Sequence, residues 1–319
     1  MMGNYSLEEF LDWDPPIRGR ISTNAAIGKT TWFQVGGNAD ILFRPKDTKD
    51  LANFLNNCPR DIGVTVIGAG SNILVRDGGI SGVTIRLRDG FRNVSFEKHN
   101  DEEVIVTCGA GALDVIVSRK AAAEGVGGLE FLSGVPGTIG GALRMNAGAY
   151  GKEMKDVVVW ATALDGQGSE HKLSNNDISF NYRHCNIPND WIFTSAALRA
   201  NILDKSAIQS SIERIANQRS DTQPIRARTS GSTFKNPNGH KAWELIDRAG
   251  CRGLRLGGAK VSEKHCNFLV NAENATAADL ENLGEEIRRR VKDSCGIILE
   301  WEIERVGQHN SSAHGSTKI

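Results

Sequence analysis

The chain has 319 residues, of which 39% are hydrophobic and 24% are charged, and this suits two or three folded domains with sizeable cores. Its 38 basic and 38 acidic residues balance, which argues against a nucleic-acid-binding surface. It contains no run of about 18 apolar residues, so we expect no transmembrane helix. The 35 glycines exceed the usual share of about 7%, which predicts tight turns or backbone that approaches a ligand closely.

The amino-terminal residues 1–24 are expected to form an extension. They include Glu8 and Glu9 and no apolar stretch, so they do not match a secretory signal peptide, and we expect a cytoplasmic protein. The six cysteines are scattered and form no C-x-x-C pair. This spacing favours reduced thiols and predicts no metal site.

Hydrophobic periodicity and turn residues predict the next elements in chain order. Helices are predicted over 47–57 and 112–124, the second ending before Gly125. Strands are predicted over 64–67, 73–75, 83–87, 104–107, 157–164 and 192–198.

The composition changes after about residue 202. The expected elements there are helices over 205–217, 243–249 and 277–291, a loop over 223–239 and a strand over 297–306. Thr276 is a plausible amino-terminal cap of the last helix, which stops before Gly296. The chain is thus strand-rich first and mixed later, which favours an α+β fold over regular βαβ alternation.

A short glycine segment follows the predicted strand 64–67. It consists of Gly68, Ala69, Gly70, Ser71 and Asn72. The segment leads into a further predicted strand, whereas a Rossmann fingerprint would open a helix. Successive backbone N–H groups in such a turn can bind an anion, and the serine and asparagine side chains suit phosphate oxygens. Alone, the pattern leaves an ordinary hairpin open.

A second glycine-rich loop is predicted within residues 134–151. Its candidate ligand contacts are Gly134, Pro136, Gly137, Thr138, Gly140, Gly141, Ala142, Asn146, Gly148 and Ala149. Backbone with so few side chains suits a flat, extended ligand, and the proline stiffens the loop. Two such segments far apart in sequence fit a dinucleotide better than a single phosphate.

The second segment reads G-x-P-G-T-x-G-G-A and then M-N-A-G-A-Y-G. This resembles the UDP-N-acetylenolpyruvoylglucosamine reductase (UDP-N-acetylmuramate dehydrogenase) family of the PCMH-type FAD-binding superfamily, over about residues 24–307. The resemblance implies a PCMH-type FAD-binding region of two subdomains plus a C-terminal α/β substrate-binding domain. The implied parts are an FAD-binding domain at 25–202, split near 90–100, and a substrate-binding domain at 203–307. The small, polar residues of the tail at 308–319 predict disorder.

The resemblance also implies the chemistry. FAD, reduced by NADPH as co-substrate, would reduce the enolpyruvyl C=C bond of UDP-N-acetylglucosamine enolpyruvate to UDP-N-acetylmuramate, for peptidoglycan precursor synthesis. His99 is the only histidine before residue 171 and lies outside both glycine segments, so we expect non-covalent FAD. A cytoplasmic protein, most simply a monomer, is expected, with neither nucleic acid nor membrane as partner.

Three further motifs match the family, namely Asn181-Tyr182-Arg183, Gly231-Ser232-Thr233-Phe234-Lys235-Asn236-Pro237 and Leu299-Glu300-Trp301-Glu302-Ile303. By resemblance, Arg183, Ser232 and Glu302 are the catalytic residues. Hydride from flavin N5 would leave negative charge that spreads into the substrate carboxylate. The Arg183 guanidinium can engage that carboxylate bidentately.

A proton must then reach the carbanionic carbon, and Ser232 in its glycine-led turn is the implied donor. Glu302 would stabilise the enol or orient the serine. Strand periodicity places Glu300 and Glu304 on the same face as Glu302, so periodicity does not choose among them. The resemblance to the family's Leu-Glu-x-Glu motif identifies Glu302 as the catalytic carboxylate.

Candidate substrate contacts are Tyr182, Arg219, Lys235, Asn236 and Lys264, of which Arg219 and Asn236 come from the resemblance. Tyr150 and Tyr182 could contact flavin or substrate, or pack in the core. The connection from Arg183 to the predicted strand 192–198 is short. In this the chain resembles the shorter class of the family, which lacks a Tyr-bearing loop over the substrate. Arg144 departs from the apolar or aromatic residue of relatives, and it could alter the flavin edge or face solvent.

Two other functions stay open at this point. The glycine segments would also suit an FAD-dependent alcohol or sugar oxidase of the same superfamily, which should lack the Ser232 and Glu302 motifs. A flavin- or nucleotide-binding protein without chemistry would show no dependence on Ser232.

Overall fold

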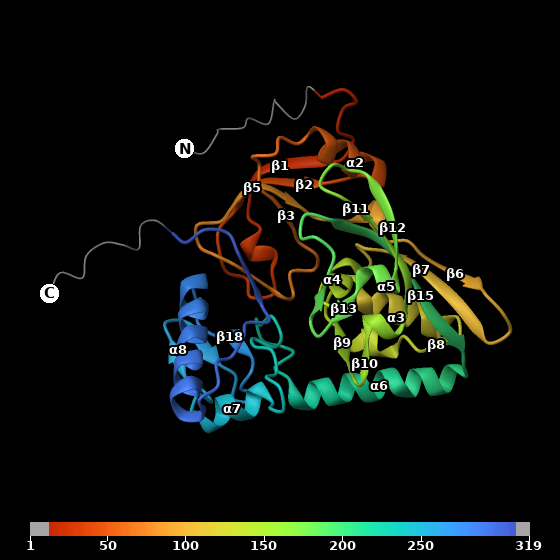
Figure 1. The fold of residues 1–319 in the computed structure, drawn as a ribbon. Helices are drawn as coiled ribbons and strands as arrows, with labels where there is room; N and C mark the ends of the chain where they lie inside the picture. The colour runs from red at the N-terminus through yellow and green to blue at the C-terminus, as the bar shows by residue number, and fades with distance from the viewer. Residues whose placement is uncertain (1–12, 311–319) are drawn as a thin grey trace. The chain divides into compact units, whose positions relative to one another are not determined.

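The structure is a computed structural model and describes residues 13–310, so the predicted extension 1–24 and tail 308–319 lie partly outside the described residues. Internal contacts divide the chain into two units that alternate along the sequence. Among the described residues, unit 1 contains those up to 23, 41–69 and 83–218, and unit 2 contains 24–40, 70–82 and those from 219 onward. Helices and strands are mixed throughout, which confirms the α+β class (Figure 1).

The first sheet has four strands in the order β1 (Arg20–Ala25), β2 (Ala39–Arg44), β5 (Ile80–Ile85) and β3 (Val64–Val66). Helix α2 (Thr48–Asn57) starts where the Asp47 carboxylate accepts a hydrogen bond from the Asp50 N–H at 2.9 Å. Such a cap satisfies one of the free N–H groups of the first turn. The helix buries Phe54, whose ring stacks on Phe43 of β2 at 4.6 Å between centroids.

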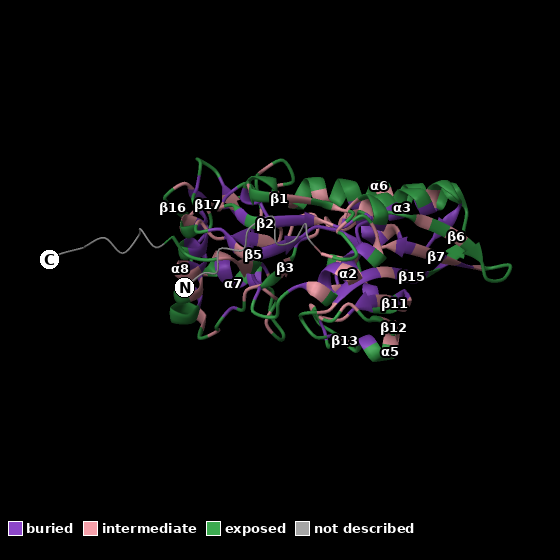
Figure 2. Cartoon of the chain, turned by 90° about the horizontal axis from the view of Figure 1, so that it is seen from above, coloured by how far each residue is buried: buried purple, intermediate pink, exposed green. Residues whose placement is uncertain are grey.

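The second sheet is antiparallel and forms the centre of unit 1. Its order is β12 (Glu170–Ser174), β11 (Val158–Leu164), β15 (Ile192–Ile202), β7 (Glu103–Gly109) and β6 (Val94–Lys98), with β8 (Val126–Gly127) paired to the end of β15. Buried and less buried residues alternate along β7, as expected for a strand with one face in the core. Figure 2 shows buried residues along β7, β11 and β15 of this sheet.

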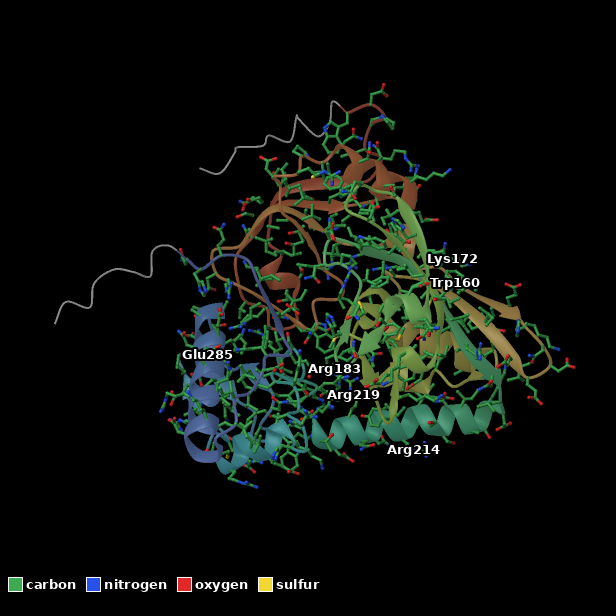
Figure 3. All side chains as sticks on the ribbon, in the orientation of Figure 1. Trp160, Lys172, Arg183, Arg214, Arg219 and Glu285 are labelled. Carbon is green, nitrogen blue, oxygen red and sulfur yellow. The ribbon has the colours of Figure 1, made fainter. Side chains whose placement is uncertain are left out.

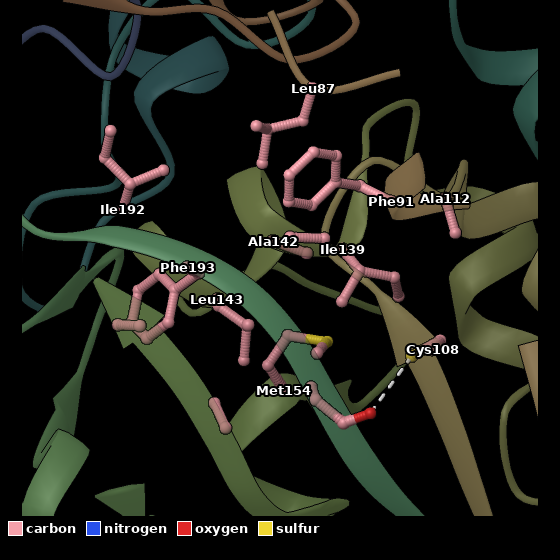
Figure 4. Packing of buried hydrophobic residues seen from close by; sticks show 14 of the residues in the cluster. Leu87, Phe91, Cys108, Ala112, Ile139, Ala142, Leu143, Met154, Ile192 and Phe193 are labelled. Carbon is pink, nitrogen blue, oxygen red and sulfur yellow. Dashed lines mark hydrogen bonds between the residues drawn. The ribbon is translucent and has the colours of Figure 1, made fainter. Parts of the chain in front are cut away.

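Short helices pack on this sheet, namely α3 (Asp114–Ala123), α4 (Ile139–Arg144) and α5 (Asn175–Ile178). Ile139, Ala142 and Leu143 of α4 are buried in the same core as Phe193 of β15 (Figure 4). The long helix α6 (Lys205–Thr222) buries Ile208 and exposes most of its remaining surface.

Unit 2 is built around the amphipathic helix α8 (Ala277–Cys295). Thr276 caps its start through a capping box, and Gly296 ends it in a left-handed conformation with φ +70°, as predicted. The helix packs on α7 (Ala242–Arg248) and on a sheet of β16 (Arg255–Leu256), β17 (Ala259–Val261) and β18 (Leu269–Asn271). A separate parallel pair joins β4 (Ile73–Val75) to β19 (Glu304–Val306).

The remaining elements are small. They are the strand pairs β9 (Gly148–Ala149) with β10 (Lys152–Glu153) and β13 (Phe180–Asn181) with β14 (His184–Cys185), and the 3-10 helices η1 (Gly28–Thr30), η2 (Asp89–Phe91), η3 (Glu130–Gly134) and η4 (Met154–Asp156). None of the helices in residues 13–310 has the length and apolar character needed to cross a bilayer.

The five predicted helices are confirmed, the hairpin alternative is excluded, and two other predictions are wrong. Residues 68–72 do not close a hairpin, because β3 pairs with β5 whereas β4 pairs with β19. The predicted loop within 134–151 contains helix α4, in which Gly140 packs against Ala110. The last strand is regular only over β19.

Candidate functional site

The two glycine segments meet within unit 1. A Cβ on Gly68 would lie 2.6 Å from the Thr138 Oγ1, so a side chain at this position would displace the second segment. A Cβ on Gly140 would likewise lie 3.1 Å from that of Ala110. These glycines let neighbouring side chains approach the backbone closely, which agrees with the close approach that the glycine content predicts.

The other half of the first segment belongs to unit 2. Gly70 has φ +74° and its carbonyl accepts a hydrogen bond from the Trp32 N–H at 3.0 Å. The Asn72 side chain donates to the Glu302 carbonyl at 3.0 Å, and the Glu304 N–H donates to the Asn72 carbonyl at 3.0 Å. The predicted cofactor loop is therefore joined directly to the segment that carries a predicted catalytic carboxylate.

Ser232 and Glu302 lie on adjacent backbone segments of unit 2. The Glu302 N–H donates to the carbonyl of Thr233, the residue after Ser232, at 2.8 Å. The neighbouring Phe234 forms a β-bridge with Trp301. Gly231 has φ +79°, a conformation that favours glycine, and it starts the turn that holds the half-buried Ser232.

The buried Asn267 holds this pair of segments. Its side-chain Oδ1 accepts from the Phe234 N–H at 3.0 Å, and its Nδ2 donates to the Phe234 carbonyl at 2.8 Å. Its own carbonyl accepts from the Thr233 N–H at 2.7 Å. One side chain thus satisfies both backbone groups of a residue two positions after Ser232.

Trp301 supports the same segments from the α8 side. A Cβ on Gly284 would lie 2.2 Å from the Trp301 ring, so only glycine leaves room for the indole. The indole N–H donates to Glu285 at 2.8 Å, and the Arg305 guanidinium lies over the ring at 4.5 Å. Figure 3 labels Glu285 on α8. The backbone around Glu302 is therefore held by packing as well as by hydrogen bonds.

Arg183 lies in unit 1, at the tip of the β13–β14 pair. Its φ of +54° is unusual for a residue with a side chain, so the turn is held by its surroundings. Its guanidinium lies over the Tyr182 ring at 5.1 Å. The buried Asn146, from the second glycine segment, donates to the Asn181 carbonyl at 3.0 Å and so fixes the residues beside Arg183.

Arg144 supports the chain after this turn. Its guanidinium donates to the carbonyls of Ile187 at 2.7 Å and Pro188 at 3.1 Å, and also to the carbonyl of Trp191. It lies over the Phe193 ring at 5.1 Å. Burial lowers the pKa of Arg144 from its ordinary value. The solvent-facing alternative for this residue is wrong, because its guanidinium donates to three backbone carbonyls and lies over an aromatic ring.

Four of the candidate substrate residues lie in unit 2 and have partners there, whereas Tyr182 lies in unit 1. The ammonium of Lys235 lies 3.8 Å from the Glu300 carboxylate, and that of Lys264 donates to the Ser220 carbonyl. Asn236 accepts from the Ala242 N–H at the start of α7 at 2.9 Å. Arg219 donates to Gln223 at 3.4 Å.

Sequence comparison relates the chain to known proteins over almost its full length. It is 53% identical to the UDP-N-acetylenolpyruvoylglucosamine reductase of Parvibaculum lavamentivorans, over 96% of this chain and 97% of that protein. It is 54% identical to the reductase of the same name from Rhodospirillum rubrum, over 93% of each. The chain belongs to the UDP-N-acetylenolpyruvoylglucosamine reductase family.

Domain and structure comparisons agree with this reductase family. Residues 223–306 match the C-terminal domain of UDP-N-acetylenolpyruvoylglucosamine reductase, and residues 39–174 match an FAD binding domain. The crystal structure of the reductase from Thermus caldophilus has a TM-score of 0.76 and 32% identity, over 91% of this chain and 99% of that one. A 6-hydroxy-D-nicotine oxidase from Arthrobacter nicotinovorans shares the fold, with a TM-score of 0.53 and 11% identity.

Sequence reasoning missed the supporting residues of this reductase. Asn267 and Trp301 lie inside or beside family-like segments, but neither periodicity nor residue type distinguishes them from ordinary core residues. Gly284 had one available signal, since a glycine inside a strongly helical pattern usually has a packing reason. Tyr150 packs against Gly134, where a Cβ would lie 2.5 Å from its ring, and its hydroxyl donates to the Ile215 carbonyl at 3.5 Å.

Proposed function

We propose that this chain is an FAD-dependent, NADPH-oxidising enzyme that reduces the enolpyruvyl C=C bond of UDP-N-acetylglucosamine enolpyruvate, giving UDP-N-acetylmuramate for peptidoglycan synthesis. The observation that carries the proposal is 53% identity to a reductase of this name across 96% of the chain. The hydrogen bond from Asn72 of the glycine loop to the Glu302 segment supports it structurally.

The described residues fit an FAD site. A Cβ on Gly68 would lie 2.6 Å from the Thr138 Oγ1, so the two glycine segments lie in contact at this point, and their backbone N–H groups suit an anionic ligand. We propose that the glycine segments 68–72 and 134–149 hold the pyrophosphate and the ring system. When bound, FAD supplies hydride transfer from NADPH to the substrate. His99 lies in the turn between β6 and β7, away from both segments in the sequence, which supports non-covalent binding.

Each proposed catalytic residue has a distinct role. Arg183 engages the substrate carboxylate, where its permanent positive charge stabilises the negative charge that develops on reduction. Ser232 donates the proton to the carbon beside that carboxylate, and such a weak acid requires accurate positioning. Glu302 stabilises the enol form and orients the serine hydroxyl. Tyr182, Arg219, Lys235, Asn236 and Lys264 are proposed to bind the nucleotide sugar.

The proposal also includes the domain bounds, the cellular location and the oligomeric state. The FAD-binding domain spans 25–202 with a division near 90–100, and the substrate-binding domain spans 203–307. The protein works in the cytoplasm as a monomer, and the chain passes from Arg183 to β15 without the Tyr-bearing loop.

The test separates the two half-reactions in Ser232→Ala. We expect flavin reduction by NADPH near the wild-type rate and substrate reduction slowed roughly 10²–10³-fold, because only the second step uses the proton donor. Stopped-flow absorbance of the flavin measures both. The control is Ser210→Ala, an exposed serine of α6, which should change neither rate. Equal slowing of both half-reactions by Ser232→Ala would exclude the proton-donor role.

A further inference from the structure

The side chain of Asn146 is buried in unit 1, between the second glycine segment and the turn that carries Arg183. The residue is 0% exposed, and its backbone has a φ of +42°. An asparagine side chain offers two N–H donors and an oxygen acceptor. Because burying an amide is costly unless these groups are hydrogen-bonded, the partners of Asn146 indicate its role.

Residues 153–155 fix the orientation of this amide. The Lys155 N–H donates to Asn146 Oδ1 at 3.0 Å, and Asn146 Nδ2 donates to Glu153 Oε2 at 3.0 Å. The same oxygen of Glu153 lies 2.8 Å from the Lys155 ammonium. A flipped amide would place its oxygen against the Glu153 carboxylate and its nitrogen against the Lys155 N–H, so one orientation is strongly favoured.

The second N–H of the amide reaches the turn of Arg183. It donates to the Asn181 carbonyl at 3.0 Å. Asn181 of β13 pairs with His184 of β14, so Tyr182 and Arg183 form a two-residue turn between them. Arg183, which Figure 3 labels, has a φ of +54°, and a residue with a side chain keeps this conformation only where its surroundings support it. Both donors of Asn146 are therefore used within the protein, one of them on the residue that begins the turn.

We propose that Asn146 and Glu153 are positioning residues for the reduction of the substrate. Glu153 orients the Asn146 amide, and the amide holds the turn in the geometry with which Arg183 meets the substrate carboxylate. The inference rests on the proposed function for the role of Arg183. It refines the role expected for Asn146, whose side chain acts on the catalytic turn, whereas the backbone of its segment remains available to the cofactor.

The first test compares the two half-reactions in Asn146→Asp by stopped-flow absorbance of the flavin. The substitution keeps the size and the acceptor for the Lys155 N–H but removes both donors. Flavin reduction by NADPH should stay within about threefold of the wild type and substrate reduction should slow roughly 10–100-fold, because the guanidinium is misplaced. Asn176→Asp, at an exposed position of α5, is the control and should change neither rate. Equal slowing of both half-reactions, or unchanged substrate reduction, would overturn the proposal.

A double variant separates positioning from packing. In Asn146→Asp with Glu153→Gln, the amide and the carboxylate exchange places, so the buried pair is restored while the Asn181 carbonyl still lacks its donor. The Tm should recover towards the wild-type value, and substrate reduction should stay slow. Recovery of the Tm and of the rate together would show that the buried pair alone matters, which overturns the proposal.

Glu153→Ala carries the test if Asn146→Asp does not fold, because the Glu153 side chain is 24% exposed and its loss is easier to accommodate. Without its acceptor the amide is less well oriented, so substrate reduction should slow roughly tenfold while flavin reduction is kept. Glu153→Gln retains an acceptor oxygen and should restore most of the rate. A wild-type rate in Glu153→Ala would overturn the role of Glu153.

A failure of the proposed function is recognisable separately, because the turn can be observed without catalysis. If the wild-type protein leaves the enolpyruvyl group intact, hydrogen–deuterium exchange of residues 180–185, followed by mass spectrometry, decides whether Asn146 holds the turn. Exchange that is roughly tenfold faster in Asn146→Asp than in the wild type supports the positioning role. Equal exchange in the two proteins overturns it.

Discussion

The two parts of the proposed active site are supported in different ways. In unit 2, Ser232 and Glu302 lie on paired backbone segments that Asn267 and the packed indole of Trp301 hold together. In unit 1, Arg183 lies in a left-handed turn whose neighbours are held by the side chains of Asn146 and Arg144. The positions of the serine and the carboxylate therefore depend on backbone pairing, whereas the position of the guanidinium depends on a few side-chain donors.

Asn267→Ala should disrupt the paired segments of unit 2 and should give the largest loss of stability among these variants. The change leaves the buried N–H and carbonyl of Phe234 without their partner, which should lower the free energy of unfolding by about 2–4 kcal/mol. Urea denaturation measures the loss. Asn56→Ala, an exposed position of α2, is the control and should stay within about 0.5 kcal/mol of the wild type. A similar small change for Asn267→Ala would contradict the supporting role.

Arg144→Met should disrupt the chain after the Arg183 turn in unit 1. The free energy of unfolding should fall by about 1–3 kcal/mol, because three backbone carbonyls lose a charged donor. Its sharper consequence is on rates. We expect substrate reduction to slow roughly tenfold while flavin reduction by NADPH is kept, since the turn beside Arg183 loses its support. Arg144→Lys should recover part of the rate. Unchanged substrate reduction in the folded Arg144→Met protein would show that the turn holds itself.

The Arg76–Glu281 ion pair gives the smallest predicted effect and belongs to unit 2. Burial raises the pKa of Glu281, but the hydrogen bonds and charge of Arg76 lower it more, so that its pKa lies below the usual 4.5. The stability that the pair contributes is therefore full above about pH 4.5 and is lost as the pH falls through the folded-state pKa.

The stability of Glu281→Gln relative to the wild type, measured at several pH values, tests the contribution of this ion pair. The variant should be less stable than the wild type by about 1 kcal/mol at pH 7, and the difference should shrink below pH 4.5. Glu97→Gln on the exposed face of β6 should show no such dependence. A difference that stays constant between pH 7 and pH 3 would exclude an electrostatic origin.

The sequence predicts the elements with strong local signals. Helix α8 is an example, because Thr276, Gly296 and the apolar stripe of α8 are all local in sequence. Pairing between distant segments has no such signal, so the partners of β3 and β4 were not predictable from their own residues. The same holds for helix α4, where Gly140, a residue that disfavours a helix, packs closely on Ala110.

In the candidate site, too, residues within recognisable motifs were predictable, whereas residues that act on distant segments were not. The sequence motifs shared with the family identify Arg183, Ser232 and Glu302 as the candidate catalytic residues. The sequence singles out Arg144 but does not reveal its supporting role or that of Asn267, because each acts on the backbone of a segment that lies elsewhere in the sequence.

The most direct test of the central claim is a product analysis under anaerobic conditions. The purified protein with FAD is mixed with NADPH and UDP-N-acetylglucosamine enolpyruvate, and both the loss of NADPH absorbance and the mass of the sugar nucleotide are followed. We predict equal amounts of NADPH oxidised and UDP-N-acetylmuramate formed. NADPH oxidation that requires oxygen and leaves the enolpyruvyl group intact would contradict the assignment.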